Sequence, residues 1–123
     1  MKLITLKEAQ EHLRIDSEDD KDYVSSLIDA ASAIAFEYLD GGDIFALKRD
    51  GNGDIEREDG EPIYQTDSED NKVIKSDIKA AVKLLVGDFY RHRENSKNVI
   101  EFGADKMPTY VAALLFPHRA RLG

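Results

Sequence analysis

The sequence predicts a mainly α-helical protein, a bundle of three to four helices with a projecting β-hairpin or loop at about residues 43–75. Three observations lead to this prediction. Apolar residues recur at helical spacing over residues 5–15, 20–40 and 76–91. Helix-capping residues, glycine or proline stand at the ends of these stretches. Between residues 43 and 75 the helical period gives way to short apolar runs separated by turn residues.

The first two helices have clear start and stop signals. Thr5 and Glu8 form a capping box that begins a short first helix. The acidic run Asp16–Asp20 is expected to cap the second helix at its positive N-terminal end. From Tyr23 to Leu39 the apolar residues follow the i, i+3, i+4, i+7 pattern. The pair Gly41-Gly42 is expected to end this helix, because glycine readily adopts the left-handed cap conformation.

The last two helices are predicted from similar signals. Ser76 opens the third helix, whose apolar stripe runs from Ile78 to Phe89. A short fourth helix begins near Pro108, a favoured first-turn residue, and is expected to stop at Pro117. We therefore expect a single domain over residues 1–123, with residues 43–75 as an acidic insertion.

Residues 43–75 contain two candidate strands, Ile44–Leu47 and Ile63–Thr66, and a pattern that partly resembles a calcium loop. The oxygen-bearing residues at loop positions 1, 3, 5 and 12 are Asp50, Asn52, Asp54 and Glu61. Ile55 stands where such a loop needs glycine for its sharp turn, and no clear helix enters the loop. The pattern therefore favours a hairpin turn with solvated carboxylates over a calcium site.

Charge is unevenly distributed along the chain, whose formal net charge is −8. Residues 50–70 carry nine acidic residues against Arg57 alone, whereas residues 71–123 carry ten basic residues against five acidic ones. Such asymmetry can steer head-to-tail association of identical subunits, because unlike surfaces then meet. The alternative is a solvated surface without a partner. Sequence-specific DNA binding is not expected of so acidic a chain.

No pattern typical of catalysis, a cofactor or a membrane span is found. The chain has no cysteine, and its histidines, His12, His92 and His118, do not share metal-ligand spacing. Nucleophile elbows and glycine-rich phosphate loops are missing from the sequence. Residues 1–16 lack the apolar core of a signal peptide, and polar residues interrupt the apolar stretch 23–39. We expect no catalytic residue, no cofactor, no bound metal and no membrane partner.

Two blocks of sequence stand in a recognisable order. Residues 5–16 read TLKEAQEHLRID, and an acidic pair and LIDAA at residues 27–31 follow. Residues 107–119 read MPTYVAALLFPHR, after a helix of small and apolar residues. With these blocks the chain resembles the head–tail connector, or adaptor, proteins of tailed phages, a family also described as DNA-packaging proteins. Residues 43–75 depart from the family's pattern, so the resemblance implies no role for them.

The resemblance implies a virion structural protein of a phage or prophage, made in the cytoplasm of the bacterial host. It implies α-helical subunits that form a ring of about a dozen copies, joining the portal and head to the tail. DNA would pass through this ring, and its partners would be the portal protein and head-completion or tail proteins. The alternative function is a small cytoplasmic regulatory or binding module that docks a basic partner through its acidic loop.

Charged residues near the expected helix ends are candidates for contacts between subunits. In this interpretation the acidic residues between the first two helices meet the basic C-terminal residues of a neighbour. The candidates are Asp16, Asp19, Asp20, Asp22, Arg91, Arg93, Arg119 and Arg121. Two alternatives remain open: the arginines after Phe89 could serve the helix dipole, and the residues after Pro117 could form a frayed terminus.

Overall fold

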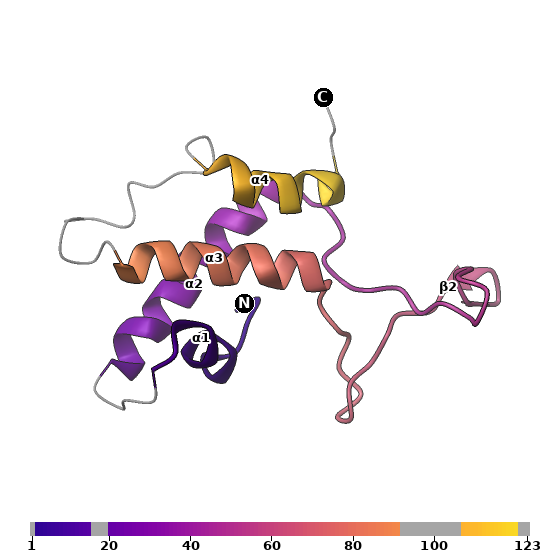
Figure 1. Cartoon of the computed structure of the whole chain (residues 1–123). Coiled ribbons are helices and arrows are strands. Elements are labelled where there is room, and N and C mark those ends of the chain that lie inside the picture. Colours follow the sequence, from indigo (N-terminus) through magenta and orange to yellow (C-terminus); the bar gives the residue numbers. More distant parts are fainter. Residues whose placement is uncertain (1, 16–19, 92–106, 121–123) are drawn as a thin grey trace. The chain divides into compact units, whose positions relative to one another are not determined.

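The computed structural model describes residues 2–15, 20–91 and 107–120, which contain four α-helices and a two-stranded antiparallel hairpin (Figure 1). This architecture confirms the predicted mainly α fold with a small hairpin. The helices are α1 (Leu6–Leu13), α2 (Lys21–Leu39), α3 (Ser76–Arg91) and α4 (Thr109–Leu115), which the 3₁₀ turn η3 (Phe116–His118) follows. The strands are β1 (Arg57–Glu58) and β2 (Glu61–Pro62). The chain divides into two compact units, a helical unit (Met1–Asp43 and Asp77–Gly123) and a β unit (Ile44–Ser76).

Helix α1 begins with the predicted capping box. The Thr5 hydroxyl accepts a hydrogen bond from the Glu8 N–H at 3.1 Å, and the Glu8 carboxylate accepts one from the Thr5 N–H at 3.0 Å. These two bonds satisfy backbone donors that the first turn of a helix leaves free. The helix ends at Arg14, which adopts the left-handed conformation with φ of 59°.

Both ends of α2 differ from their prediction. Asp20 occupies the N-cap position, but its carboxylate makes no capping bond and instead accepts one from the Tyr90 hydroxyl at 2.7 Å. The other members of the predicted acidic cap, residues 16–19, lie outside the described residues. At the C-terminal end the left-handed cap is Asp40, with φ of 50°, and Gly41 follows with φ of 85°. Gly42 has no positive φ, so it does not act as a left-handed helix cap.

Proline acts differently than predicted at both ends of α4. Pro108 is the N-cap residue rather than a residue of the first turn. Pro117 does not end the helical path, because the chain continues into η3 with proline in its first turn. The first N–H groups of a helix have no acceptor within the helix, so proline there removes no hydrogen bond.

The core lies in the helical unit. Ser32 is the one polar residue, among those that the structure describes, that is buried there. Its hydroxyl accepts the Leu3 N–H at 2.9 Å, which fixes the segment before α1 to the middle of α2. The core is otherwise apolar and includes Leu3, Ile4, Ala9, Val24, Leu27, Ile28, Ala31, Ile34, Ala35, Leu39, Ile78, Ala81, Val82, Leu85, Val86, Phe89, Val111 and Leu115. Most of these are the predicted stripe residues of α2 and α3.

The β unit is built from four extended segments, residues 44–49, 55–58, 61–66 and 72–75, that share hydrogen bonds in closed triangles of three segments each. In one triangle the donor–acceptor pairs are Ala46–Val73 at 2.8 Å, Val73–Gln65 at 2.9 Å and Gln65–Ala46 at 2.9 Å. In the other they are Lys48–Ile63 at 2.8 Å, Ile63–Glu56 at 3.0 Å and Glu56–Lys48 at 2.9 Å. Because each of these residues donates to one segment and accepts from another, the segments form no continuous ladder outside the short β1–β2 pairing. The predicted strands 44–47 and 63–66 are therefore extended segments with single bridging pairs, and this prediction was wrong.

Three turns connect these segments. Asp59 and Gly60, with φ of 53° and 83°, form the two-residue turn between β1 and β2, in which both central residues need positive φ. The other two turns are capped by an aspartate that accepts two backbone N–H groups. Asp50 does so for Asn52 and Asp54, and Asp67 for Glu69 and Asn71.

Candidate subunit interface

A basic face lies along α3 of the helical unit. Lys79, Lys83, Gly87 and Arg91 follow one another at intervals of four residues, so they share one side of the helix. Lys79 is paired with Glu8 of α1, with Nζ 3.1 Å from Oε2. At Gly87 the missing side chain leaves room for the imidazole of His12: a Cβ there would lie 3.4 Å from His12 Nε2. We refer to His12, Lys83 and Arg91 together as the basic face.

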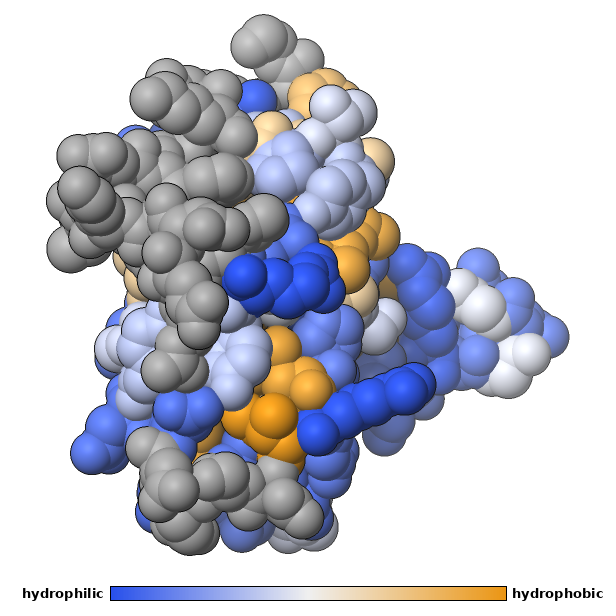
Figure 2. Space-filling model, turned by 60° about the vertical axis from the view of Figure 1, so that its left-hand side comes forward, coloured by the Kyte–Doolittle hydropathy of each residue, from blue (hydrophilic) through white to orange (hydrophobic). Residues whose placement is uncertain are grey.

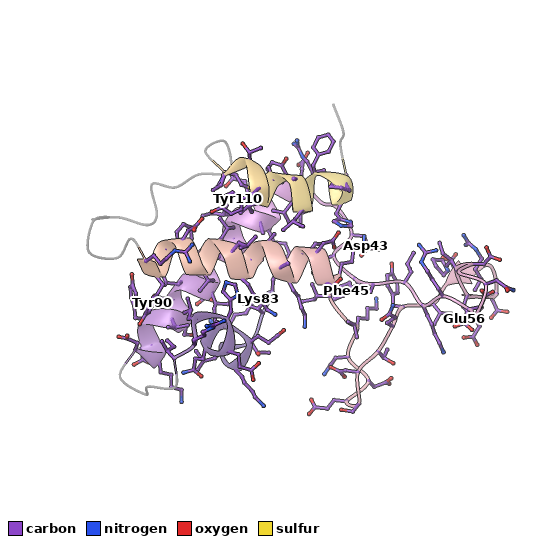
Figure 3. All side chains as sticks on the ribbon, viewed as in Figure 1. Asp43, Phe45, Glu56, Lys83, Tyr90 and Tyr110 are labelled. Atoms are coloured by element: carbon purple, nitrogen blue, oxygen red, sulfur yellow. The ribbon has the colours of Figure 1, made fainter. Side chains whose placement is uncertain are left out.

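The charges of Lys83 and Arg91 lie close enough to His12 to affect its ionisation. Partial burial lowers the pKa of His12, and the nearby charges of Lys83 and Arg91 lower it further. Within the part of the chain that the structure describes, Lys83 makes no ion pair with a carboxylate (Figure 3). Arg91 does have a partner, Asp88, at 2.5 Å. The face therefore carries at least one cation without a carboxylate among the described residues.

Asp88 joins the end of α3 to α4. Its carboxylate accepts a hydrogen bond from the Tyr110 hydroxyl, which reaches from α4 toward α3 (Figure 3), as well as from Arg91. This hydrogen bond raises the pKa of Tyr110, and partial burial and the charge of Asp88 raise it further. One carboxylate thus holds both the tyrosine ring and a guanidinium at the end of α3.

Helix α4 is apolar on its outer side as well as its inner one. Val111 and Leu115 are fully buried, whereas Tyr110 and Phe116 are 50% and 47% exposed. No charged residue occurs between Thr109 and Pro117, so little of this surface favours water. On the face drawn in Figure 2, hydrophobic side chains reach the surface between strongly hydrophilic ones. Exposed aromatic side chains of this kind are common at protein interfaces.

The residues after α4 are fixed to the end of α2. The Ala120 N–H donates to the Leu39 carbonyl at 3.1 Å, and His118 Nε2 lies 2.5 Å from Asp77 Oδ2. The Arg119 guanidinium lies over the Tyr38 ring, with Cζ 4.8 Å from its centroid. Arg119 Nε is buried, and among the described residues it has no hydrogen-bond partner. Residues 118–120 are therefore packed, in contrast to the frayed terminus that the sequence left open.

The predicted interface residues are not brought together as a group. Asp20 is bound by Tyr90, Arg91 by Asp88, and Arg119 by the Tyr38 ring. Asp22 is exposed in the first turn of α2. The remaining candidates, Asp16, Asp19, Arg93 and Arg121, lie outside the described residues, as does His92. Their contacts with a neighbouring subunit stay a prediction.

The sequence interpretation missed two features of this surface. It did not anticipate that half of the Tyr110 side chain would be exposed. A signal was available, because a helix that is apolar on all sides must bury its second face elsewhere. The contact between His12 and Gly87 could not be predicted from local sequence patterns, since the two residues are distant in the sequence.

The acidic residues among the calcium-loop candidates are not grouped together in the described part of the chain. Asp50 Oδ1 is occupied by the N–H groups of Asn52 and Asp54, at 2.8 Å and 3.1 Å. Glu61 lies in β2, directly opposite Glu58. Across residues 2–15, 20–91 and 107–120, no three histidine or acidic side chains are grouped so that they could hold a metal ion. In the same ranges, no helix has the length and apolar character needed to cross a membrane.

Comparison with known proteins gives a match to a family model. The family model described as phage gp6-like head-tail connector protein matches residues 3–115, which includes all four helices and the β unit. Neither curated proteins nor solved structures gave a match.

Proposed function

The chain belongs to the phage gp6-like head-tail connector family, and on this premise we propose that it forms a ring that joins the portal and head of a tailed phage to its tail. DNA passes through the centre of the ring. The ring contacts the portal protein on one side and head-completion or tail proteins on the other.

The family match over residues 3–115 carries this proposal, because it spans nearly the whole chain rather than one motif. The match itself supports a structural connector of the virion. The capping box lies within it, and so do residues 107–115 of the C-terminal block that carried the resemblance in sequence.

The exposed surface of the helical unit supports self-association. Tyr110 and Phe116 leave an apolar outer side on α4, and the basic face of α3 lies on the same unit. A closed ring needs heterologous contacts, in which two unlike surfaces of the same chain meet. Apolar contact supplies free energy to such an interface, whereas charge mainly directs its orientation.

Mass measurement by light scattering over a concentration series, with negative-stain images of the largest species, tests this proposal. A ring of about a dozen copies is the expected species, either for the free protein or after mixing with a portal protein that nucleates it. A stable dimer that never grows larger, with or without portal, would contradict the proposal and favour the small binding module.

A further inference from the structure

The β1–β2 hairpin carries carboxylates that oppose one another. Glu58 and Glu61 are register partners across the hairpin, and Asp59 occupies the turn between them. Like charges directly opposite each other destabilise a strand pair. Within the described residues none of the three makes an ion pair, and the adjacent Arg57 guanidinium donates to the Gly60 carbonyl at 3.1 Å. We refer to Glu58, Asp59 and Glu61 as the acidic hairpin.

The basic face, in contrast, carries positive charge that is not fully paired within the described residues. Lys83 has no carboxylate partner among the described residues, and His12 stands between it and Arg91. The two clusters have unlike sign: the hairpin carboxylates oppose one another, and Lys83 lacks a counter-charge among the described residues. A contact between the clusters would bring opposite charges together.

We propose that the acidic hairpin of one copy of this chain docks on the basic face of a second copy. The inference rests on the proposed ring, and it names the two unlike surfaces that such a ring needs. A second copy is the favoured occupant because both surfaces belong to the same chain and have complementary charge. Contact would place Glu58 and Glu61 near Lys83 and Arg91.

Charge reversal on each surface tests the proposal, with mass by light scattering at low salt as the measurement. One variant carries Lys83→Glu, and the other carries Glu58→Lys together with Glu61→Lys. Each alone should raise the concentration at which the ring forms by about tenfold or more, since repulsion replaces attraction at every interface. An equimolar mixture should regain the ring, because alternating copies then present opposite charges throughout.

Two controls separate this effect from general changes in charge or folding. Lys7→Glu makes the same charge change as Lys83→Glu on an exposed residue of α1, and it should leave the ring unchanged. Circular dichroism should show native helix content in all variants. The loss of the ring should also appear in wild type as the salt concentration rises, because exposed charges are then screened.

The possible outcomes distinguish the docking proposal from the proposed function. If wild type forms no ring even with portal, the proposed function fails. If wild type forms the ring and the reversed variants form it equally well, the docking proposal alone is overturned. If the mixture stays dissociated but a chain with all three reversals assembles, the hairpin docks on its own chain, which also overturns the proposal.

Discussion

Gly42 offers the sharpest test of how the helical unit is held together. A Cβ at this position would overlap the carbonyl oxygen of His118 and would lie 3.0 Å from its carbonyl carbon and 3.2 Å from Ala120 N. These are backbone atoms, so no side chain can move aside. The substitution Gly42→Ala should therefore separate the end of α2 from the segment after α4.

Steric overlap and a broken hydrogen bond together set the size of the effect. Forcing a methyl group into a packed site costs about 1–3 kcal/mol. Breaking the hydrogen bond from Ala120 N–H to the Leu39 carbonyl adds about 1 kcal/mol. Together they predict a decrease of about 2–4 kcal/mol in the free energy of unfolding, or about 8–16 °C in Tm for a chain of 123 residues.

Thermal and urea unfolding of Gly42→Ala and Gly41→Ala would measure the effect. Gly41 is the matched control because it lies in the same turn with nothing within 4 Å of an added Cβ. Its φ of +85° makes alanine cost about 1 kcal/mol through backbone strain alone. If Gly42→Ala proved no more destabilising than Gly41→Ala, the packing of residues 118–120 against α2 would be refuted.

Substitutions at three further positions have definite expected outcomes. Ser32→Ala leaves the buried Leu3 N–H without an acceptor and should lower the free energy of unfolding in urea by about 1–3 kcal/mol. Ser32→Thr retains a hydroxyl and should lower it by less. Equal decreases for the two variants would contradict the hydrogen-bond argument. Gly87→Ala should stabilise α3 by about 0.5–1 kcal/mol, because alanine favours the helix more than glycine does. The new Cβ would lie 3.4 Å or more from its neighbours, which is ordinary contact. A decrease in stability would show that the site is too tight for a methyl group. Burial opposes ionisation of Glu8, but hydrogen bonds from Thr5 and the Lys79 charge outweigh it and hold its pKa below 4.5. The resulting stability is present above pH 4.5 and is lost as the pH falls through the folded pKa, so Glu8→Gln, which keeps a capping acceptor, should make unfolding less pH-dependent in that acid range.

The β unit shows how an acidic segment can be ordered without a core of its own. Its four extended segments satisfy one another's backbone groups in closed triangles, and two of its three turns are capped by Asp50 and Asp67. The Lys72 ammonium lies over the Tyr64 ring, 4.3 Å from its centroid, and Tyr64 meets Phe45 edge to face. Many of the carboxylates that make this segment acidic are thus left exposed on the surface.

The sequence by itself determined the four helices and the segment between the second and third of them. Capping boxes and apolar periodicity act within a few residues, so Thr5 with Glu8 and the stripe of α2 could be read directly. The Asp59-Gly60 pair is also a local signal for a two-residue hairpin turn, but the interpretation passed over it in favour of Ile44–Leu47 and Ile63–Thr66.

Only the tertiary structure decided the contacts between distant parts of the sequence. The carboxylate of Asp20 does not cap α2; it accepts a hydrogen bond from the hydroxyl of Tyr90, seventy positions later in the sequence. Gly42 was predicted as a helix stop, yet its small size matters because His118 packs against it. No local rule contains these pairings, since they depend on where the core brings α2, α3 and the C-terminal turn together. The sequence therefore determined which elements form, and the packing of those elements determined which charged residues are left exposed for a partner.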